Sequence, residues 1–197
     1  MPSQVNSISS SLPDTSFASK CSKDVKMPAV SEDMLLDQVN QADIPIGHVR
    51  RRDVFAERAG FRVAHVLIFD SRGQLLLQRL ALSRNRNPGA WGSSVASYLF
   101  ASESYDAAAI RRLREELGVT TSRPSFFGKT EMMDDGCLKF ICVFTLKHDG
   151  PFAVDRSHIG EVEFVLPLGV QQMIDDGTRQ FTPTFLQVFR YYRSRSL

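Results

Sequence analysis

Two adjacent glutamates at the end of a predicted helix are the residues of this chain best suited to chemistry. Glu115 and Glu116 lie about 100° apart around a helix, and Arg112 stands three and four residues before them. Arg112 and Glu116 therefore share one helix face. Carboxylate oxygens are good ligands for Mg²⁺, which commonly bridges a protein to the phosphates of a substrate. The spacing favours a metal site and salt bridges at a solvated helix end equally.

A longer pattern surrounds this helix. The segment 97–119 resembles the Nudix box, G-x5-E-x7-R-E-U-x-E-E-x-G-U, in which U is an aliphatic residue. Two positions depart from the pattern: Ser97 stands where the glycine belongs, and Arg112 stands where the first helical glutamate belongs. The positions that match are Glu103, Arg111, Leu113, Glu115, Glu116, Gly118 and Val119.

The resemblance implies a hydrolase of diphosphate compounds. Nudix hydrolases cleave a nucleoside diphosphate linked to another group, and their box carboxylates bind divalent cations. By this resemblance Mg²⁺ or Mn²⁺ is held by Glu103, Glu115 and Glu116. A cation lowers the pKa of a bound water and polarises phosphoryl oxygens. Arg111 matches the arginine that orients the carboxylates. Because Arg112 repels a nearby metal ion, we expect weakened metal binding.

Catalytic roles follow from the same resemblance. Glu115 and Glu116 match the later pair of box glutamates. Glu161 precedes a late strand, in a region from which some family members supply a base. A surface glutamate without a role is the simpler interpretation of Glu161 taken alone.

Four further motifs resemble type I isopentenyl-diphosphate isomerases, which belong to the Nudix superfamily. The resemblance extends from about Asp37 to Tyr192. The motifs are Gly73–Leu76, Ala81–Ser83, Pro88–Trp91 and Arg111–Arg114.

The acid–base residues of those isomerases are replaced in this chain. Ala96 stands at the position of the isomerase cysteine and Tyr98 at that of a histidine. The downstream glutamate pair of the isomerases falls near Cys137 and Lys139. Since alanine has no proton to transfer, the isomerase mechanism cannot run unchanged, although Tyr98 could serve as an acid in altered chemistry.

The basic side of the isomerase site is better preserved. The resemblance maps phosphate-contacting residues onto Arg112, Arg84 and one of the arginines at 50–52, for which we take Arg51. Guanidinium groups suit the oxygens of a diphosphate. Trp91 and Tyr98 are expected to line the pocket beside them. These residues predict a small-molecule diphosphate as the ligand.

Three functions therefore remain open. The first is a metal-dependent Nudix hydrolase impaired by Arg112. The second is an isoprenoid-diphosphate enzyme with altered chemistry that uses Tyr98 or another acid in the pocket. The third is a non-catalytic diphosphate-binding module in which Arg112 pairs with Glu115 and Glu116 in place of the cation.

Composition limits the class of protein. A net charge of +2 argues against nucleic acid as a partner, and no apolar run reaches the roughly 20 residues of a membrane span. The three cysteines show no CxxC spacing, which favours a reduced, cytoplasmic location. Self-association is compatible with this composition.

Periodicity predicts one folded domain after a tail. Residues 1–33 are polar and serine-rich and predict a flexible tail, and residues 34–197 form the domain. The fold class is α+β, an α/β/α sandwich with a mixed β-sheet flanked by helices. Strands are predicted over 36–40 and 44–49 (a hairpin), 61–69, 74–82, 91–99, 125–133, 138–146 and 161–166, and helices over 105–117, 169–176 and 183–195. His65, within an apolar strand, is expected to be a core residue.

Overall fold

The computed structural model describes residue 1 and residues 32–196, so most of the predicted tail lies outside the described residues. The strands are β1 (Leu35–Val39), β2 (Pro45–Arg50), β3 (Phe61–Phe69), β4 (Leu75–Leu80), β5 (Trp91–Gly92), β6 (Val95–Tyr98), β7 (Ser125–Asp134), β8 (Cys137–Lys147) and β9 (Ile159–Val165). The helices are the short 3₁₀ helix η1 (Arg51–Asp53) and the α-helices α1 (Tyr105–Leu117), α2 (Pro167–Asp175) and α3 (Pro183–Arg193).

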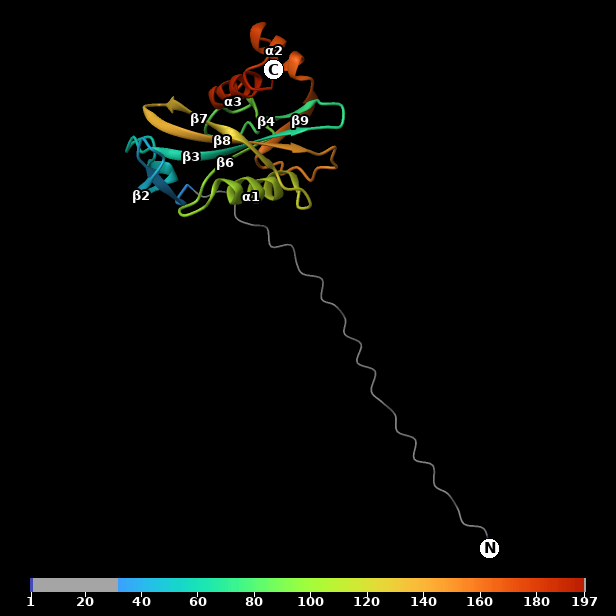
Figure 1. The fold of residues 1–197 in the computed structure, drawn as a ribbon, viewed down its shortest axis with the longest axis horizontal. Coiled ribbons are helices and arrows are strands. Elements are labelled where there is room, and N and C mark those ends of the chain that lie inside the picture. The colour runs from blue at the N-terminus through green and yellow to red at the C-terminus, as the bar shows by residue number, and fades with distance from the viewer. Residues whose placement is uncertain (2–31, 197) are drawn as a thin grey trace.

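Helices cover both faces of a mixed sheet. In Figure 1, α1 lies on one side of the strands, and α2 and α3 lie on the other. The seven-stranded sheet combines a parallel pair, β3 with β8, with antiparallel pairs that include β7 with β8 and β4 with β9. The predicted α+β class and the sandwich of helices and mixed sheet are confirmed.

Strand β3 divides the core in two. Val63 and Leu67 belong to a cluster that includes side chains of α3, whereas Val66 and Ile68 belong to a cluster that includes side chains of α1. Successive side chains of a strand point to opposite faces, so the alternation of β3 feeds both layers. His65 falls on the same face of β3 as Val63 and Leu67.

The predicted strand over 91–99 is wrong in one respect, because it is two short strands separated by Ser93 and Ser94. Ser94 Oγ donates a hydrogen bond to the carbonyl of Leu76 over 2.6 Å and accepts one from the N–H of Ile68 over 2.8 Å. The side chain of Ser94 thus links β3 to β4, and the segment of Ser93 and Ser94 separates β5 from β6.

Helix α1 begins and ends as its sequence predicts. Ser104 caps the first turn by accepting a hydrogen bond from the N–H of Ala107. Gly118 ends the helix in the left-handed conformation, with φ +68°, and its N–H donates to the carbonyl of Arg114. The two caps fix the length of the helix and therefore the positions of Glu115 and Glu116.

Helix α2 starts at Pro167, two residues before the predicted start, because proline suits the first helical turn.

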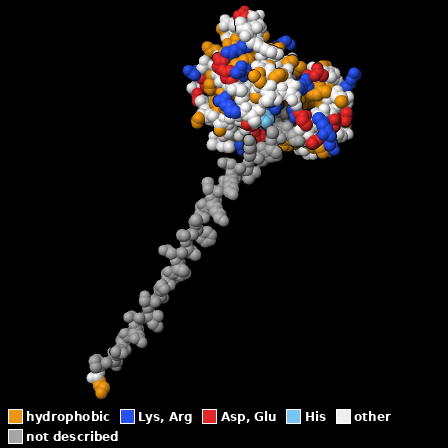
Figure 2. Space-filling model, turned by 180° about the vertical axis from the view of Figure 1, so that it is seen from behind, with side chains coloured by type: hydrophobic (Ala, Val, Ile, Leu, Met, Phe, Trp, Pro, Cys, Tyr) orange, Lys and Arg blue, Asp and Glu red, His pale blue; other side chains and the backbone are white. Residues whose placement is uncertain are grey.

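Within the described part of the chain, no helix has the length and apolar character that crossing a bilayer requires. Figure 2 shows Lys and Arg side chains interspersed with Asp and Glu on the face that it draws.

Candidate functional site

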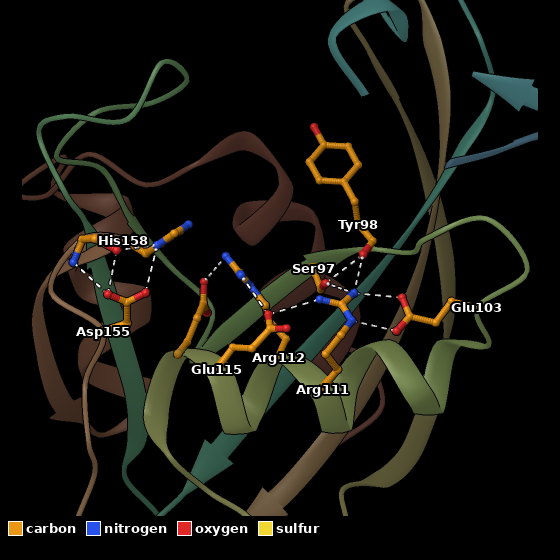
Figure 3. A network of polar contacts seen from close by, with 10 residues as sticks. Ser97, Tyr98, Glu103, Arg111, Arg112, Glu115, Asp155 and His158 are labelled. Atoms are coloured by element: carbon orange, nitrogen blue, oxygen red, sulfur yellow. Dashed lines mark hydrogen bonds and ion pairs between the residues drawn. The ribbon is translucent and has the colours of Figure 1, made fainter. Parts of the chain in front are cut away.

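Arg111 joins helix α1 to the loop before it. Its Nε and Nη2 atoms donate to the two carboxylate oxygens of Glu103 over 2.7 and 2.8 Å (Figure 3). Nη2 also donates to Ser97 Oγ and to the carbonyl of Tyr98, each over 3.1 Å. Glu103 accepts a further hydrogen bond from the N–H of Phe100. Both oxygens of Glu103 are therefore bound within the chain, and Ser97 adds a contact that a glycine there would lack.

Arg112 binds both of the adjacent glutamates. Its Nη2 atom lies 2.6 Å from Glu116 Oε1, and its Nη1 atom lies 3.1 Å from Glu115 Oε2. The side chains of Arg112 and Glu116 are 6% and 5% exposed. Burial raises the pKa of Glu116, although Arg112 and Arg84 oppose it. Burial alone would lower the pKa of Arg112, but Glu116 and Glu115 outweigh it and raise that pKa. The arginine thus compensates two carboxylates that are costly to bury.

A cavity of about 380 Å³ opens beside Arg112 and Glu116. This volume falls in the range of small-molecule sites. Helix α1, strands β3, β4, β6 and β8 and the loop after β4 all contribute side chains to it. Its lining consists of Val63, His65, Gln78, Leu80, Arg84, Arg86, Asn87, Gly92, Ser93, Ala96, Ser97, Tyr98, Arg112, Glu116, Asp134, Asp135, Lys139, His158, Thr182, Pro183 and Thr184.

Arg84 is the cation of this pocket that lacks a carboxylate partner. Within the described residues its guanidinium group makes no hydrogen bond or ion pair, and it is partly buried. Burial lowers the pKa of Arg84, and the charges of Arg112 and Arg51 act in the same direction, while Glu116 opposes them. Arginine stays protonated throughout the physiological pH range. Arg84 therefore presents to the pocket a positive charge that no carboxylate of the described residues contacts directly.

A second ionic cluster forms another part of the lining. Lys139 Nζ contacts Asp134 and donates to Thr184 Oγ1 over 2.8 Å. Arg86 lies 2.9 Å from both Asp134 and Asp135. Burial lowers the pKa of Lys139 although Asp134 opposes it. Burial opposes ionisation of Asp134, yet Lys139 and Arg86 prevail and lower its pKa. The cations of this cluster are already paired, in contrast to Arg84.

Tyr98 lines the pocket and is held by its neighbours. Its ring stacks on Phe61 at 5.4 Å between centroids, and the guanidinium group of Arg51 lies 5.0 Å from the ring centre. Figure 3 shows the ring directed away from helix α1. Burial raises the pKa of Tyr98, although Arg51 opposes it, so the phenol is a weaker acid than usual. Arg51 itself pairs with Glu32 and does not line the cavity.

Two predicted site residues lie together outside the pocket. Trp91 is buried, with Arg179 over its ring at 4.4 Å and Arg79 at 5.9 Å. Glu161 is about half exposed and pairs with Arg79 over 2.9 Å. Both are strand neighbours of Arg79, which places them at one location. Of the predicted site residues, the structure thus brings Tyr98, Arg84, Arg112 and Glu116 to the cavity, with Glu115 bound to Arg112 behind it.

Sequence reasoning assigned no role to several residues of the lining. Lys139 alternates with Cys137 and Ile141 on a buried face of β8. A lysine among buried apolar residues of a strand could have indicated a site residue. Gln78 interrupts the buried apolar run of β4 in the same way. His65 is buried, as expected for a core residue, but it also lines the cavity.

The arrangement of the helix carboxylates does not fit a divalent cation. Glu103 is bound by Arg111, and the guanidinium group of Arg112 lies where a cation would have to approach Glu115 and Glu116. Within residues 32–196, no cluster of three or more His, Cys, Asp or Glu side chains is arranged to hold a metal ion. Glu116 Oε2 is buried and accepts no hydrogen bond from the described residues.

Comparisons with known proteins identify the family and the fold. The NUDIX domain model matches residues 60–185. A protein of Pseudomonas aeruginosa named as an uncharacterized Nudix hydrolase is 28% identical, and the match covers 83% of this chain and 96% of that protein. The crystal structure of DR0079 from Deinococcus radiodurans superimposes with a TM-score of 0.72 at 24% identity, over 80% of this chain and 98% of that one.

A further relative carries a different activity in its name. Isopentenyl-diphosphate Delta-isomerase 2 of Photorhabdus laumondii is 25% identical, over 79% of this chain and 90% of that protein. Nudix hydrolases generally use divalent metals. Because the NUDIX domain model matches more than half of the residues of this chain, the chain belongs to the Nudix domain family.

Proposed function

We propose that the cavity binds a small molecule containing a diphosphate, and that Arg84 is its main anchor. The observation that carries this proposal is the guanidinium group of Arg84, which has no anionic partner among the described residues. Arg112 lies close enough to lower the pKa of Arg84, so two guanidinium groups face one region. Guanidinium forks bind phosphoryl oxygens by charge-assisted hydrogen bonds. A diphosphate would relieve the repulsion between these cations.

We further propose that metal-assisted hydrolysis is slow in this chain. Like charges about 4 Å apart repel by roughly 4 kcal/mol at an effective dielectric constant near 20, and a divalent ion doubles the effect. Such an ion would also have to displace Arg112 from Glu115 and Glu116. The fixed guanidinium group therefore takes the place of the metal as counter-charge of the carboxylates. Binding of a diphosphate then needs no divalent cation.

Calorimetric titration with inorganic pyrophosphate, in a buffer containing a chelator, tests this proposal. We expect binding by the unaltered protein, weakened about 10- to 100-fold in Arg84→Gln through loss of a charged hydrogen bond. Arg114→Gln is the matched control, because Arg114 is exposed on the far side of α1 and does not line the cavity. Equal affinity in Arg84→Gln and the unaltered protein, or no association of pyrophosphate at millimolar concentration, would reject the proposal.

A second candidate function is an isoprenoid-diphosphate enzyme with altered chemistry. It is favoured by the place of Ala96 and Tyr98, which line the same cavity as Arg84. These are the positions that the resemblance assigns to the acid–base pair of an isomerase. Incubation with isopentenyl diphosphate followed by product analysis tests this function. It requires an isomer or another product that retains the diphosphate, and loss of turnover in Tyr98→Phe.

A further inference from the structure

Three buried polar atoms of the cavity lining have no hydrogen-bond partner among the described residues. They are Gln78 Oε1, Arg112 Nε and Glu116 Oε2. Arg112 and Glu116 belong to the ionic network of helix α1, and their other atoms are paired. Gln78 is different, because it lies on strand β4 in an apolar run and its residue is only 3% exposed. Buried side-chain oxygens are nearly always hydrogen-bonded in folded proteins.

Gln78 belongs to an uncharged polar part of the lining. It pairs through the backbone with Gly92. The next residue, Ser93, is buried, and its Oγ atom forms a 2.8 Å hydrogen bond with His65 Nδ1. Burial, assisted by the charge of Lys139, lowers the pKa of His65 to about 3, so the imidazole is neutral at physiological pH. We call Gln78, Ser93 and His65 the neutral wall. It shares the cavity with Arg84 and Arg112.

A ligand that fills this cavity has to meet two different surfaces. Its anionic part suits Arg84, and the part that reaches the neutral wall comes against the oxygen of Gln78. An N–H or O–H group of the ligand would donate to that oxygen. A hydrocarbon group packed against it would leave this buried oxygen without a hydrogen bond, which is unfavourable. The neutral wall therefore favours ligands that carry a hydrogen-bond donor over ligands that carry a hydrocarbon group.

We propose that Gln78 is a specificity residue, which accepts a hydrogen bond from an N–H or O–H donor on the group attached to the diphosphate. This inference rests on the proposed diphosphate site and adds the nature of the second half of the ligand. A sugar or a nucleobase supplies such donors, and a prenyl chain supplies none. Gln78 positions the uncharged half of the ligand, while Arg84 holds its phosphates.

Affinities of the unaltered protein for four probes provide the first test. ADP-ribose and UDP-glucose carry donors, isopentenyl diphosphate carries a hydrocarbon, and pyrophosphate carries no second group. We expect at least one of the two polar probes to bind about tenfold more tightly than isopentenyl diphosphate. Tighter binding of isopentenyl diphosphate than of both polar probes would overturn the inference. Failure of pyrophosphate to bind would instead refute the proposed diphosphate site.

The variant Gln78→Met provides the second test, because methionine keeps the volume and removes the acceptor. We expect about tenfold weaker binding of the preferred polar probe, with affinities for pyrophosphate and isopentenyl diphosphate within about twofold of the unaltered protein. A thermal melt verifies that the variant is folded, and the comparison of probes in the unaltered protein needs no variant. Equal weakening of every probe, or no weakening of the polar probe, would show that Gln78 has only a structural role.

Discussion

Arg112 Nη2 lies 2.6 Å from Glu116 Oε1, and both side chains are almost completely buried at the edge of the cavity. The pKa of Glu116 is raised by burial, which means that folding disfavours its charge, while the pKa of Arg112 is raised by its two glutamates. Each side chain of the pair therefore stabilises the charged form of the other. Removal of the arginine leaves a buried carboxylate without its nearest cation.

The first prediction is that Arg112→Met destabilises the fold at neutral pH by roughly 3 kcal/mol. With Arg112 gone, the folded pKa of Glu116 rises further above the value of 4.5 of the free side chain. A raised folded pKa gives stability that is present below the unfolded pKa and is lost as the pH rises through the folded pKa. The defect should therefore be small near pH 4.5 and largest at neutral pH and above. Urea unfolding at several pH values measures it.

Two controls separate this effect from a general loss of packing. The double variant Arg112→Met with Glu116→Met should recover most of the stability, because replacing both members of a buried pair is nearly neutral. Glu161→Gln breaks an exposed pair with Arg79 and should cost less than about 1 kcal/mol. A double variant as unstable as Arg112→Met at every pH would contradict the electrostatic explanation.

The fold was more predictable than the site, because helices and strands depend mainly on residues that are neighbours in the sequence. Strand β3 follows from its apolar, β-branched run and helix α1 from its caps, and both signals are properties of neighbouring residues. The interruption at Ser93 and Ser94 was missed because it depends on a bond between Ser94 and the distant Leu76. No local pattern encodes such a contact.

The candidate site was predictable only where the family pattern reaches. Arg84, Arg112, Glu116 and Tyr98 were found through resemblance, and they line one cavity. Trp91 was expected to line the same pocket, yet it lies outside the cavity, where its ring contacts Arg79 and Arg179. Much of the remaining lining, such as Gln78 of β4 and Lys139 of β8, comes from elements that the topology brings together from distant parts of the chain.

The second prediction concerns Gly118, which ends helix α1 with φ +68°. A Cβ atom there would lie 2.7 Å from Ala153 Cβ, so Gly118→Ala adds a steric clash to the cost of a left-handed conformation. We expect a loss of roughly 2–4 kcal/mol. Gly73→Ala is the matched control, because Gly73 has φ +77° with nothing within 4 Å of its Cβ position. Its loss should be about 1–2 kcal/mol. Equal losses of stability in the two variants, measured by thermal unfolding, would show that Ala153 moves aside at no cost.

The third prediction follows from His65, whose pKa is lowered by burial and by Lys139 to about 3 from an ordinary value of 6.5. A depressed folded pKa gives stability that is present above the unfolded pKa and is lost as the pH falls through the folded pKa. Between pH 6.5 and about 3, stability should therefore fall by up to roughly 1.4 kcal/mol per pH unit from this group. His65→Gln should flatten that slope. His48→Gln, whose side chain is 55% exposed, should retain it. An unchanged slope in His65→Gln would contradict the assignment.

The fourth prediction is that Arg112→Glu creates a metal site that the present arrangement opposes. The change removes the cation that Glu115 and Glu116 share and places three carboxylates close together near the end of helix α1. Hard divalent ions prefer such oxygens, so calorimetry should show Mn²⁺ binding at least about tenfold tighter than in the unaltered protein.

Hydrolysis of a bound diphosphate should then become dependent on Mg²⁺ and faster by a similar factor, because the metal polarises phosphoryl oxygens. Arg114→Glu makes the same change of charge on the exposed side of the helix and should alter neither property. The neutral variant Arg112→Gln should fall between them, since it frees the carboxylates without adding one. If Arg112→Glu is folded but binds Mn²⁺ no better than Arg114→Glu, then Arg112 is not what keeps metal from these glutamates.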